Sequence, residues 1–344
     1  MTSIFIEPLD VLYLRGNKLF ADAGAHGEAL MPPWPSLAAG AIRSRLMAEA
    51  ATIVPPADFR LTQFGLARQL DGKVIEQLWP LPADVIVSEE LKLDDATYLR
   101  PTNAPTGIGS SYALPKLPTL QTAKPGKPVG GLWLNGDGIN TWLAGRALNP
   151  KHFVRSGELW QTDPRLGITL DPATRSAADG KIYTTETIAL QNGVGFHATY
   201  EGSTHHLPAE SIVRLGGDGR GAVVRFVTPP TIAPDWTRIE KERRFRLMLT
   251  TPGLFSAGWQ PDGISAMLVS ASVSRAETVS GWDLVTNKPK PAQRVAPTGS
   301  VYWYENFTGD LAALKALALT GFPIADPARH AEGFGKLAIA PWAA

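Results

Sequence analysis

Residues 4–14 read IFIEPLDVLYL, and residues 36–50 read SLAAGAIRSRLMAEA. The first stretch is typical of a strand, with an edge position or a bulge at Pro8, which cannot donate a ladder hydrogen bond. The second places apolar side chains at helical spacing behind Ser36, whose hydroxyl we expect to cap the helix. A polar turn and a proline-rich segment separate the two stretches. The chain therefore opens as strand, loop and helix.

Further along the first half, the expected elements are a hairpin, a short helical turn, a glycine-rich loop and a strand, at residues 182–200, 210–214, 215–221 and 222–227. The hairpin prediction depends on two β-rich runs joined by Asn192-Gly193. The resulting order, β-α-β-β-α-β, is that of a ferredoxin-like domain. Residues about 55–165 show no clear pattern, and we interpret them as insertions with hidden hairpins.

The second half repeats this theme after a proline-rich boundary that starts at Pro229. Alternating apolar and polar residues at 245–249 predict a half-buried strand. Asp310 caps a helix that Gly321 closes. Further strands are expected at residues 266–273, 301–304 and 337–340. We predict an α+β protein of two tandem ferredoxin-like (RRM/RAMP) domains with large loop insertions, at residues 1–228 and 229–344.

Composition limits the functional classes. The 344 residues are 44% hydrophobic, enough for two packed domains, and the net charge is +1. Any nucleic-acid site must therefore be a local basic patch or use backbone donors. The absence of cysteine excludes disulfides, thiolate metal sites and cysteine nucleophiles. With no signal peptide or membrane-spanning stretch in sight, we expect a cytoplasmic protein.

Several segments resemble, in the same order, the third subunit of type III-B Cmr complexes, a family in the RAMP superfamily of CRISPR proteins. These are residues 6–16, 31–43, 167–183 with Glu186, 215–220, 297–303 and 333–335. The resemblance is weak from about residue 55 to residue 162. It also departs from the family pattern after the first strand: family members usually read Arg-Asp-Gly-Arg-Pro-Phe, whereas residues 15–20 here read RGNKLF, without the aspartate and with Lys18 for the second arginine. A bidentate phosphate contact at Lys18 is not expected, because lysine is a point charge.

The resemblance implies a non-catalytic, RNA-binding subunit that holds the 5′ handle of the guide (CRISPR) RNA in antiviral defence. It implies contacts with the large cyclase/polymerase-like subunit and neighbouring backbone RAMP subunits, and with target RNA indirectly through the guide–target duplex. A protruding hairpin in such subunits is a wedge in that duplex. No cofactor and no metal are expected, and a search for common enzyme motifs finds none.

The candidate RNA-binding residues are mostly basic or glycine: Arg15, Gly16, Lys18, His26, Arg43, Lys124, Lys127, Arg214, Gly216, Gly217, Gly219, Arg220, Gly333, Gly335 and Lys336. Glycines allow close backbone approach, and successive N–H groups can hold a phosphate. Each site also has a plain structural interpretation: a tight turn at the glycine-rich loop, solvated turn residues at 15–18, and a charged helix face at Arg43. Lys124 and Lys127 are compatible with the wedge, a phosphate contact or a surface loop.

Two further functions stay open. One is a RAMP-type endoribonuclease that processes precursor guide RNA with His26 as general acid or base, although no second catalytic partner is visible. The other is a structural scaffold without RNA contact.

Overall fold

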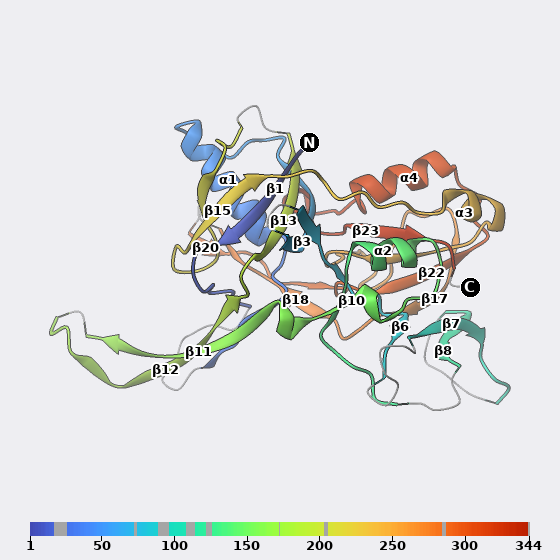
Figure 1. Ribbon diagram of the computed structural model, residues 1–344, viewed down its shortest axis with the longest axis horizontal. Helices are drawn as coiled ribbons and strands as arrows, with labels where there is room; N and C mark the ends of the chain where they lie inside the picture. The colour runs from blue at the N-terminus through green and yellow to red at the C-terminus, as the bar shows by residue number, and fades with distance from the viewer. Residues whose placement is uncertain are drawn as a thin grey trace.

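The structure of the chain is a computed structural model. It describes residues 1–16, 26–71, 74–88, 96–107, 114–121, 126–171, 173–202, 206–283 and 287–342, with the backbone alone at residues 26 and 178–181. The fold is mixed α/β, with many strands and few helices (Figure 1).

A six-stranded antiparallel sheet forms the core of the first half, in the order β14-β15-β1-β13-β3-β4. Its strands are β1 (Thr2–Pro8), β3 (Arg60–Leu70), β4 (Val74–Gln77), β13 (Val194–Glu201), β14 (Ser211–Arg214) and β15 (Gly221–Phe226). The predicted first strand is shorter than expected, because it ends at Pro8. Residues 210–214 were predicted as a helical turn, and this is wrong: Ser211 and Val213 are buried while Ile212 and Arg214 are exposed, the alternation of a strand.

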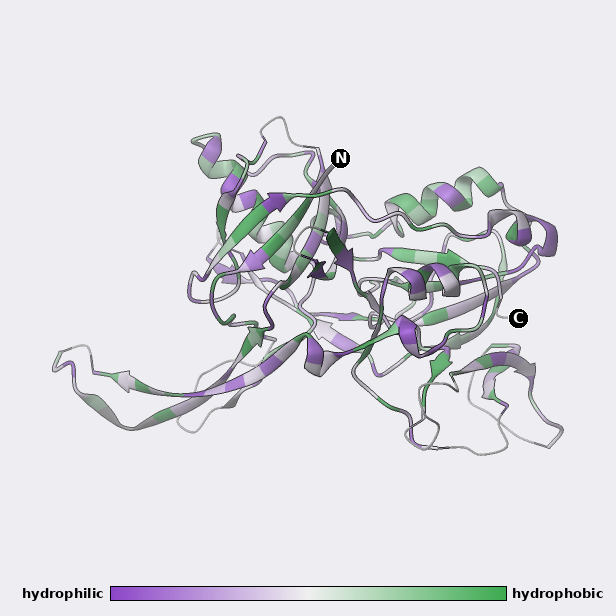
Figure 2. Ribbon diagram, viewed as in Figure 1, coloured by the Kyte–Doolittle hydropathy of each residue, from purple (hydrophilic) through white to green (hydrophobic). Residues whose placement is uncertain are grey.

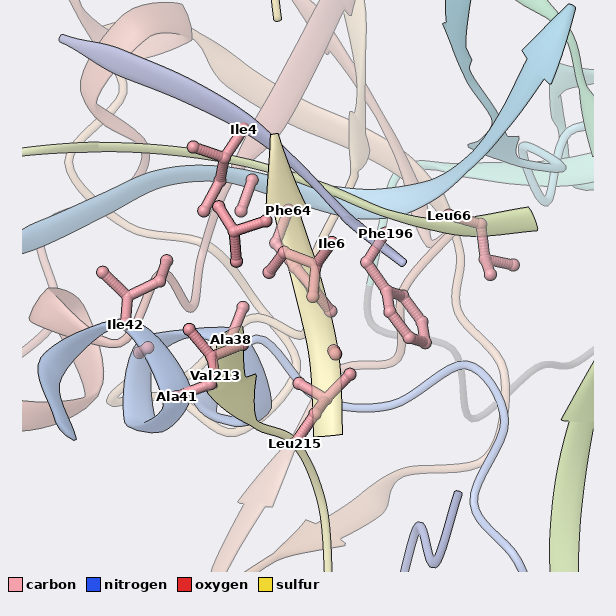
Figure 3. Packing of buried hydrophobic residues seen from close by; sticks show 14 of the residues in the cluster. Ile4, Ile6, Ala38, Ala41, Ile42, Phe64, Leu66, Phe196, Val213 and Leu215 are labelled. Carbon is pink, nitrogen blue, oxygen red and sulfur yellow. The ribbon is translucent and has the colours of Figure 1, made fainter. Parts of the chain in front are cut away.

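Helix α1 (Ser36–Glu49) covers one face of this sheet, as its apolar spacing predicts. Ala38 and Ile42 pack with Ile4 and Ile6 of β1 in a fully buried cluster (Figure 3). The predicted cap is wrong, since Pro35 occupies the N-cap position and no side chain caps the helix.

The second half holds a four-stranded antiparallel sheet in the order β17-β22-β16-β23. Its strands are β16 (Phe245–Leu249), β17 (Met267–Ser272), β22 (Val301–Glu305) and β23 (Leu337–Ala340). Helices α3 (Trp236–Glu242), α4 (Leu311–Thr320) and α5 (Pro327–Ala331) accompany it. Ile239 of α3 and Leu314 of α4 join the core on one face. Asp310 caps α4 and Gly321 ends it, as predicted.

Residues 79–155 cover the opposite face of this second sheet. The segment contains β5 (Trp79–Pro80), β6 (Val85–Ile86), β7 (Thr97–Asn103), β8 (Lys116–Leu120), β9 (Leu132–Leu134), α2 (Gly136–Leu143) and β10 (Phe153–Arg155). Trp79 and Trp142 pack there with Met248 and Trp303. All five residues of β16 are therefore buried, and the prediction of a half-buried strand is wrong. Packing thus crosses the predicted boundary at Pro229.

A long hairpin of β11 (Trp160–Leu170) and β12 (Ala177–Leu190) projects from the body of the molecule (Figure 1). The predicted hairpin of residues 182–190 with 194–200 is therefore wrong. The chain does turn at Asn192-Gly193, where Gly193 has φ +73° and Val194 N–H donates to Gln191 O at 3.0 Å. However, β13 is buried almost throughout and lies in the centre of the first sheet, between β1 and β3.

Short pairings complete the description: β2 (His26–Gly27) lies parallel to β12, β18 (Glu277–Val279) pairs with β21 (Gln293–Val295), and β19 (Trp282–Asp283) pairs with β20 (Lys288–Pro289). None of the helices in the described part of the chain has the length and apolar character needed to span a lipid bilayer.

Candidate nucleic-acid interface

Residues 9–16, which follow β1, form a connecting segment between the glycine-rich loop and the base of the hairpin. Leu12 exchanges two backbone hydrogen bonds of 2.9 Å with Ile188 of β12. The next residue, Tyr13, accepts a 2.9 Å hydrogen bond on its carbonyl from Gly217 N–H. Arg15 pairs with Ala29 across a further bridge. One short segment therefore joins the loop and the hairpin.

The glycine-rich loop, residues 215–221, has a backbone that demands glycine. Gly216 has φ +75°, and a Cβ there would lie 2.9 Å from the Tyr13 carbonyl oxygen. Asp218 and Gly219 also have positive φ, at +61° and +62°, and both are exposed. Their N–H groups donate to no described residue. Successive N–H groups in such a backbone conformation form a concavity that suits an anion.

Two arginines beside this loop differ in whether a carboxylate offsets their charge. Arg220 donates to Asp10 at 2.5 Å and lies 3.4 Å from Asp218, so carboxylates already offset its charge. Its guanidinium carbon is 5.3 Å from the centroid of the Tyr13 ring. Arg214, at the end of β14, is exposed and makes no ion pair with the described residues. Arg214 is therefore better placed than Arg220 to meet a phosphate.

Arg165, in the middle of β11 opposite Thr185, adds a further cation. Its guanidinium forms contacts of 3.0 and 2.9 Å with Asp163 and interacts electrostatically with the side chain of Tyr13. These neighbours raise the pKa of Arg165, most of all through the hydrogen bond that Arg165 donates to Asp163. Near the tip, large aliphatic side chains are exposed on one face: Leu166, Ile168 and Leu170 of β11 and Ile182 of β12. The same region is green in the hydropathy view (Figure 2).

The two faces of this hairpin differ. Ile168 lies directly opposite Ile182 in the register, and both are more than half exposed. On the other face Gly167 lies opposite Tyr183, whose ring occupies the space that a side chain at 167 would need. The hairpin thus has an aliphatic face and a face that carries Arg165 and Tyr183.

The structure brings together only some of the predicted residues. Those gathered around the connecting segment are Arg15, Gly16, Arg214, Gly216, Gly217, Gly219 and Arg220. Lys18 and Lys124 lie outside the described residues, and His26 is described by its backbone alone, as part of β2. Lys127 is exposed but belongs to the segment that covers the second sheet, where Pro128 pairs with Ser88.

Arg43 does not lie on an open helix face. Its guanidinium carbon is 4.7 Å from the centroid of the Phe59 ring, and burial lowers the pKa of Arg43, with Glu332 acting in the opposite sense. The contact accounts for this arginine within the fold.

Gly333, Gly335 and Lys336 lie in the interior. Gly333 has φ +91° and faces Leu61 of β3, while Gly335 N–H donates to Pro252 O at 2.9 Å. Lys336 is 7% exposed, its Nζ donates to Thr320 O at 2.6 Å, and burial lowers the pKa of Lys336 to about 8. This segment packs the second sheet against the first, which explains its glycines without a ligand.

No pattern in the sequence marked Tyr13 as a contact between the glycine-rich loop and the hairpin, or Arg165 as a cation of this site. Tyr13 lay inside the predicted first strand, so nothing marked it as a contact between distant segments. Arg165 immediately precedes Leu166, Ile168 and Leu170, whose alternation indicates a strand and was the signal available.

Comparisons with known proteins agree with this architecture. One chain, from "Cryo-EM structure of the Type III-B Cmr-beta bound to cognate target RNA and AMPPnP, state 1", aligns with a TM-score of 0.50 at 13% identity, over 92% of this chain and 88% of that one. A second Cmr-beta chain, bound to cognate target RNA, has a TM-score of 0.49 at 14% identity, over 88% and 86%. A chain of a type III-A Csm3-Csm4 subcomplex has a TM-score of 0.38 at 12% identity, over 90% and 94%. No curated protein matches the sequence.

The fold is thus of the class found in a type III-B Cmr complex. The family described as CRISPR-associated protein (Cas_Cmr3) matches residues 4–342, almost the whole chain. The chain belongs to this family and is a type III-B effector subunit, which confirms the resemblance seen in the sequence.

Proposed function

We propose that this subunit is non-catalytic and holds the 5′ handle of the guide RNA at the glycine-rich loop. The observation that carries the proposal is the exposed pair of N–H groups at Asp218 and Gly219, beside the unpaired Arg214. Backbone donors and a few cations position a nucleic-acid backbone without a large basic surface, in keeping with the net charge of +1.

We further propose that each half is a ferredoxin-like unit that has kept one of its two helices. Counted along the chain, both sheets contain the order fourth-first-third-second, as β15-β1-β13-β3 and as β23-β16-β22-β17. The first keeps the helix after its first strand, α1, and the second keeps the helix before its last strand, α4. In the first half, β14 takes the place of the second helix. In the second half, irregular chain takes the place of the first helix.

The β11–β12 hairpin is the proposed wedge in the guide–target duplex. Apolar side chains inserted between base steps unstack them, and Leu166, Ile168 and Ile182 offer an exposed aliphatic face for this. Arg165 and Tyr183 on the other face suit phosphate and base contacts. The handle site and the wedge would then be neighbours, since the connecting segment bonds to both.

The proposed partners are guide RNA, target RNA through the duplex, the large cyclase/polymerase-like subunit and neighbouring backbone RAMP subunits. Support comes from the similar chain in a Cmr-beta complex bound to cognate target RNA. The proposed location is the cytoplasm.

Guide occupancy of the assembled complex tests the handle site. Arg15→Gln and Arg214→Gln together should lower occupancy and reduce the salt dependence of RNA binding, because two phosphate contacts are lost. Arg244→Gln is the matched control, since Arg244 follows α3 at the opposite end of the molecule (Figure 1). Unchanged occupancy in the double variant, with intact assembly, would favour the scaffold without RNA contact.

The endoribonuclease is the second candidate, and incubation of the purified protein with precursor guide RNA separates it from the first. Metal-independent cleavage that disappears in His26→Ala would refute the non-catalytic proposal. Intact precursor RNA, bound but uncut, would support it.

A further inference from the structure

Tyr13 is the residue of the connecting segment that contacts both the glycine-rich loop and the hairpin. We propose that Tyr13 is a positioning residue that couples RNA bound at the loop to the orientation of the β11–β12 hairpin. This inference rests on the proposed handle site and goes beyond it, because it assigns a role to a residue that need not touch RNA.

On the loop side, Tyr13 is held by its backbone and its ring. Its carbonyl accepts from Gly217 N–H at 2.9 Å, and its Cβ lies within 3.2 Å of the position that a Cβ would take at Gly217. Arg220 places its guanidinium carbon 5.3 Å from the ring centroid, within the range of a cation–π contact. A movement of the Arg220 guanidinium therefore changes its contact with the Tyr13 ring.

On the hairpin side, Tyr13 interacts with Arg165 in the middle of β11. Arg165 in turn forms 3.0 and 2.9 Å contacts with the Asp163 carboxylate. Thr187 Oγ1 of β12 donates to the Asp163 carbonyl oxygen at 3.0 Å, which joins the two strands at the same level. Leu12 also pairs with Ile188 of β12. The connecting segment therefore contacts the backbone of β12 and, through Tyr13, the side chain of Arg165 on β11.

A phosphate at the loop adds a third anionic partner for Arg220, which now bonds Asp10 at 2.5 Å and lies 3.4 Å from Asp218. A change of partner alters where the guanidinium sits over the Tyr13 ring. The ring carries the hydroxyl that interacts with Arg165, so the shift reaches the middle of β11. A hairpin as long as this one turns a small rotation at the base into a large displacement at the tip.

The absence of cysteine makes the test direct, because one introduced thiol can be labelled alone. Ala173→Cys places a fluorophore at an exposed position in the hairpin turn. With the full-length protein, RNA carrying only the 5′ handle should raise the anisotropy of the label. Tyr13→Phe keeps the ring and removes the hydroxyl; it should keep RNA affinity within about threefold but lose at least half of the anisotropy rise.

Two controls separate positioning from general damage. Tyr98→Phe makes the same chemical change in the segment over the second sheet, where the hydroxyl donates to Arg146 O at 3.0 Å, and it should leave the anisotropy rise unchanged. Arg165→Lys should retain more of the rise than Arg165→Leu, since lysine keeps a donor for the tyrosine oxygen and a charge beside Asp163, and leucine keeps neither.

An equal rise in wild type and Tyr13→Phe would overturn the coupling and indicate that the RNA contacts the hairpin directly. RNA binding without any rise in the wild type would also overturn it, and would leave the proposed handle site intact. Absence of RNA binding to the wild type, measured separately by titration, would remove the handle site and the coupling together.

Discussion

Two Arg–Asp pairs, one at the surface end of the first sheet and one inside the second, show how differently the two regions use the same chemistry. Arg220 and Asp10 have side-chain exposures of 25% and 52%, and Arg246 and Asp84 are both at 0%. Around the buried pair, Trp142 Nε1 donates to Asp84 at 3.0 Å and Arg246 donates to the Trp142 carbonyl at 3.2 Å. The surface pair has water as an alternative partner and can be rearranged by a ligand, whereas the buried pair cannot.

The two glycine-rich segments differ in the same way. A Cβ at Gly219 would meet nothing within 4 Å, while one at Gly333 would lie 3.1 Å from the Leu61 carbonyl oxygen. Both segments match the family resemblance, and both were predicted to bind RNA. A glycine required by the family pattern therefore indicates a backbone constraint, and only exposure of the surrounding N–H groups separates a binding loop from a packed one.

The largest expected effect comes from breaking the buried pair. Arg246→Met should lower the free energy of unfolding by about 3–5 kcal/mol, because Asp84 is left charged and unpaired in the interior. Chemical denaturation measures this loss. Adding Asp84→Asn removes the orphaned charge, so the double variant should be more stable than the single one. If it is no more stable, the unpaired carboxylate is not the source of the loss.

The second effect depends on pH and on an unpaired group in the first sheet. His197 is 1% exposed, neither ring nitrogen has a partner among the described residues, and burial lowers the pKa of His197 from 6.5 to about 4. The folded state thus binds the proton more weakly than the unfolded state. The contribution of His197 to the free energy of unfolding is fully present above pH 6.5. It is lost as the pH falls towards 4, which lowers the free energy of unfolding by about 3 kcal/mol.

Urea denaturation of the wild type and His197→Asn between pH 4 and pH 7 isolates this contribution. The variant should show a shallower loss of stability towards acid, while carboxylates titrate equally in both. Parallel pH profiles would mean that His197 does not titrate differently in the folded and unfolded states.

The third prediction contrasts the two glycines. Gly333→Ala should cost roughly 2 kcal/mol, because it adds backbone strain to a close contact with Leu61. Gly219→Ala should cost about 1 kcal/mol, from the left-handed conformation alone. Thermal unfolding compares them. Equal losses at the two sites would show that the packing at Leu61 yields to a methyl group.

The smallest effect on stability is expected for the surface pair. Arg220→Gln should change the free energy of unfolding by less than about 1 kcal/mol, as exposed ion pairs contribute little. Denaturation of this variant beside Arg246→Met gives the sharpest form of the comparison. A loss of similar size in both would contradict the distinction between the two regions.

Local signals in the sequence predicted two of the described helices, α1 and α4, but not α2, α3 or α5. Asp310 and Gly321 bound α4 because a side-chain cap and a positive-φ glycine act within one helical turn. The apolar spacing after residue 36 predicted α1, because helical periodicity is also a local property of the sequence. The glycine-rich loop was also recognisable, since the positive φ values at Gly216 and Gly219 favour glycine.

Long-range pairing was less accessible. Asn192-Gly193 makes a turn, but burial decides which strands pair, and β13 has a place at the centre of the sheet. Nothing near residues 79–155 indicates that they cover a sheet made by residues 245–340. For that reason Arg246 was taken for an outward residue of a half-buried strand, and Arg165 and Tyr13 were not associated with each other.

The coverage of the second sheet by an early segment has a consequence for synthesis. Asp84 and Arg246 are 162 residues apart in sequence. At a bacterial or eukaryotic elongation rate, the ribosome takes roughly 10–30 seconds to add that length. During this interval Trp79, and Trp142 once it has been added, have no sheet to cover, so the nascent chain exposes them and the uncompensated Asp84 until its last third emerges. The unfinished chain is therefore more exposed to aggregation than the complete one, because its apolar surface is uncovered until the second sheet forms.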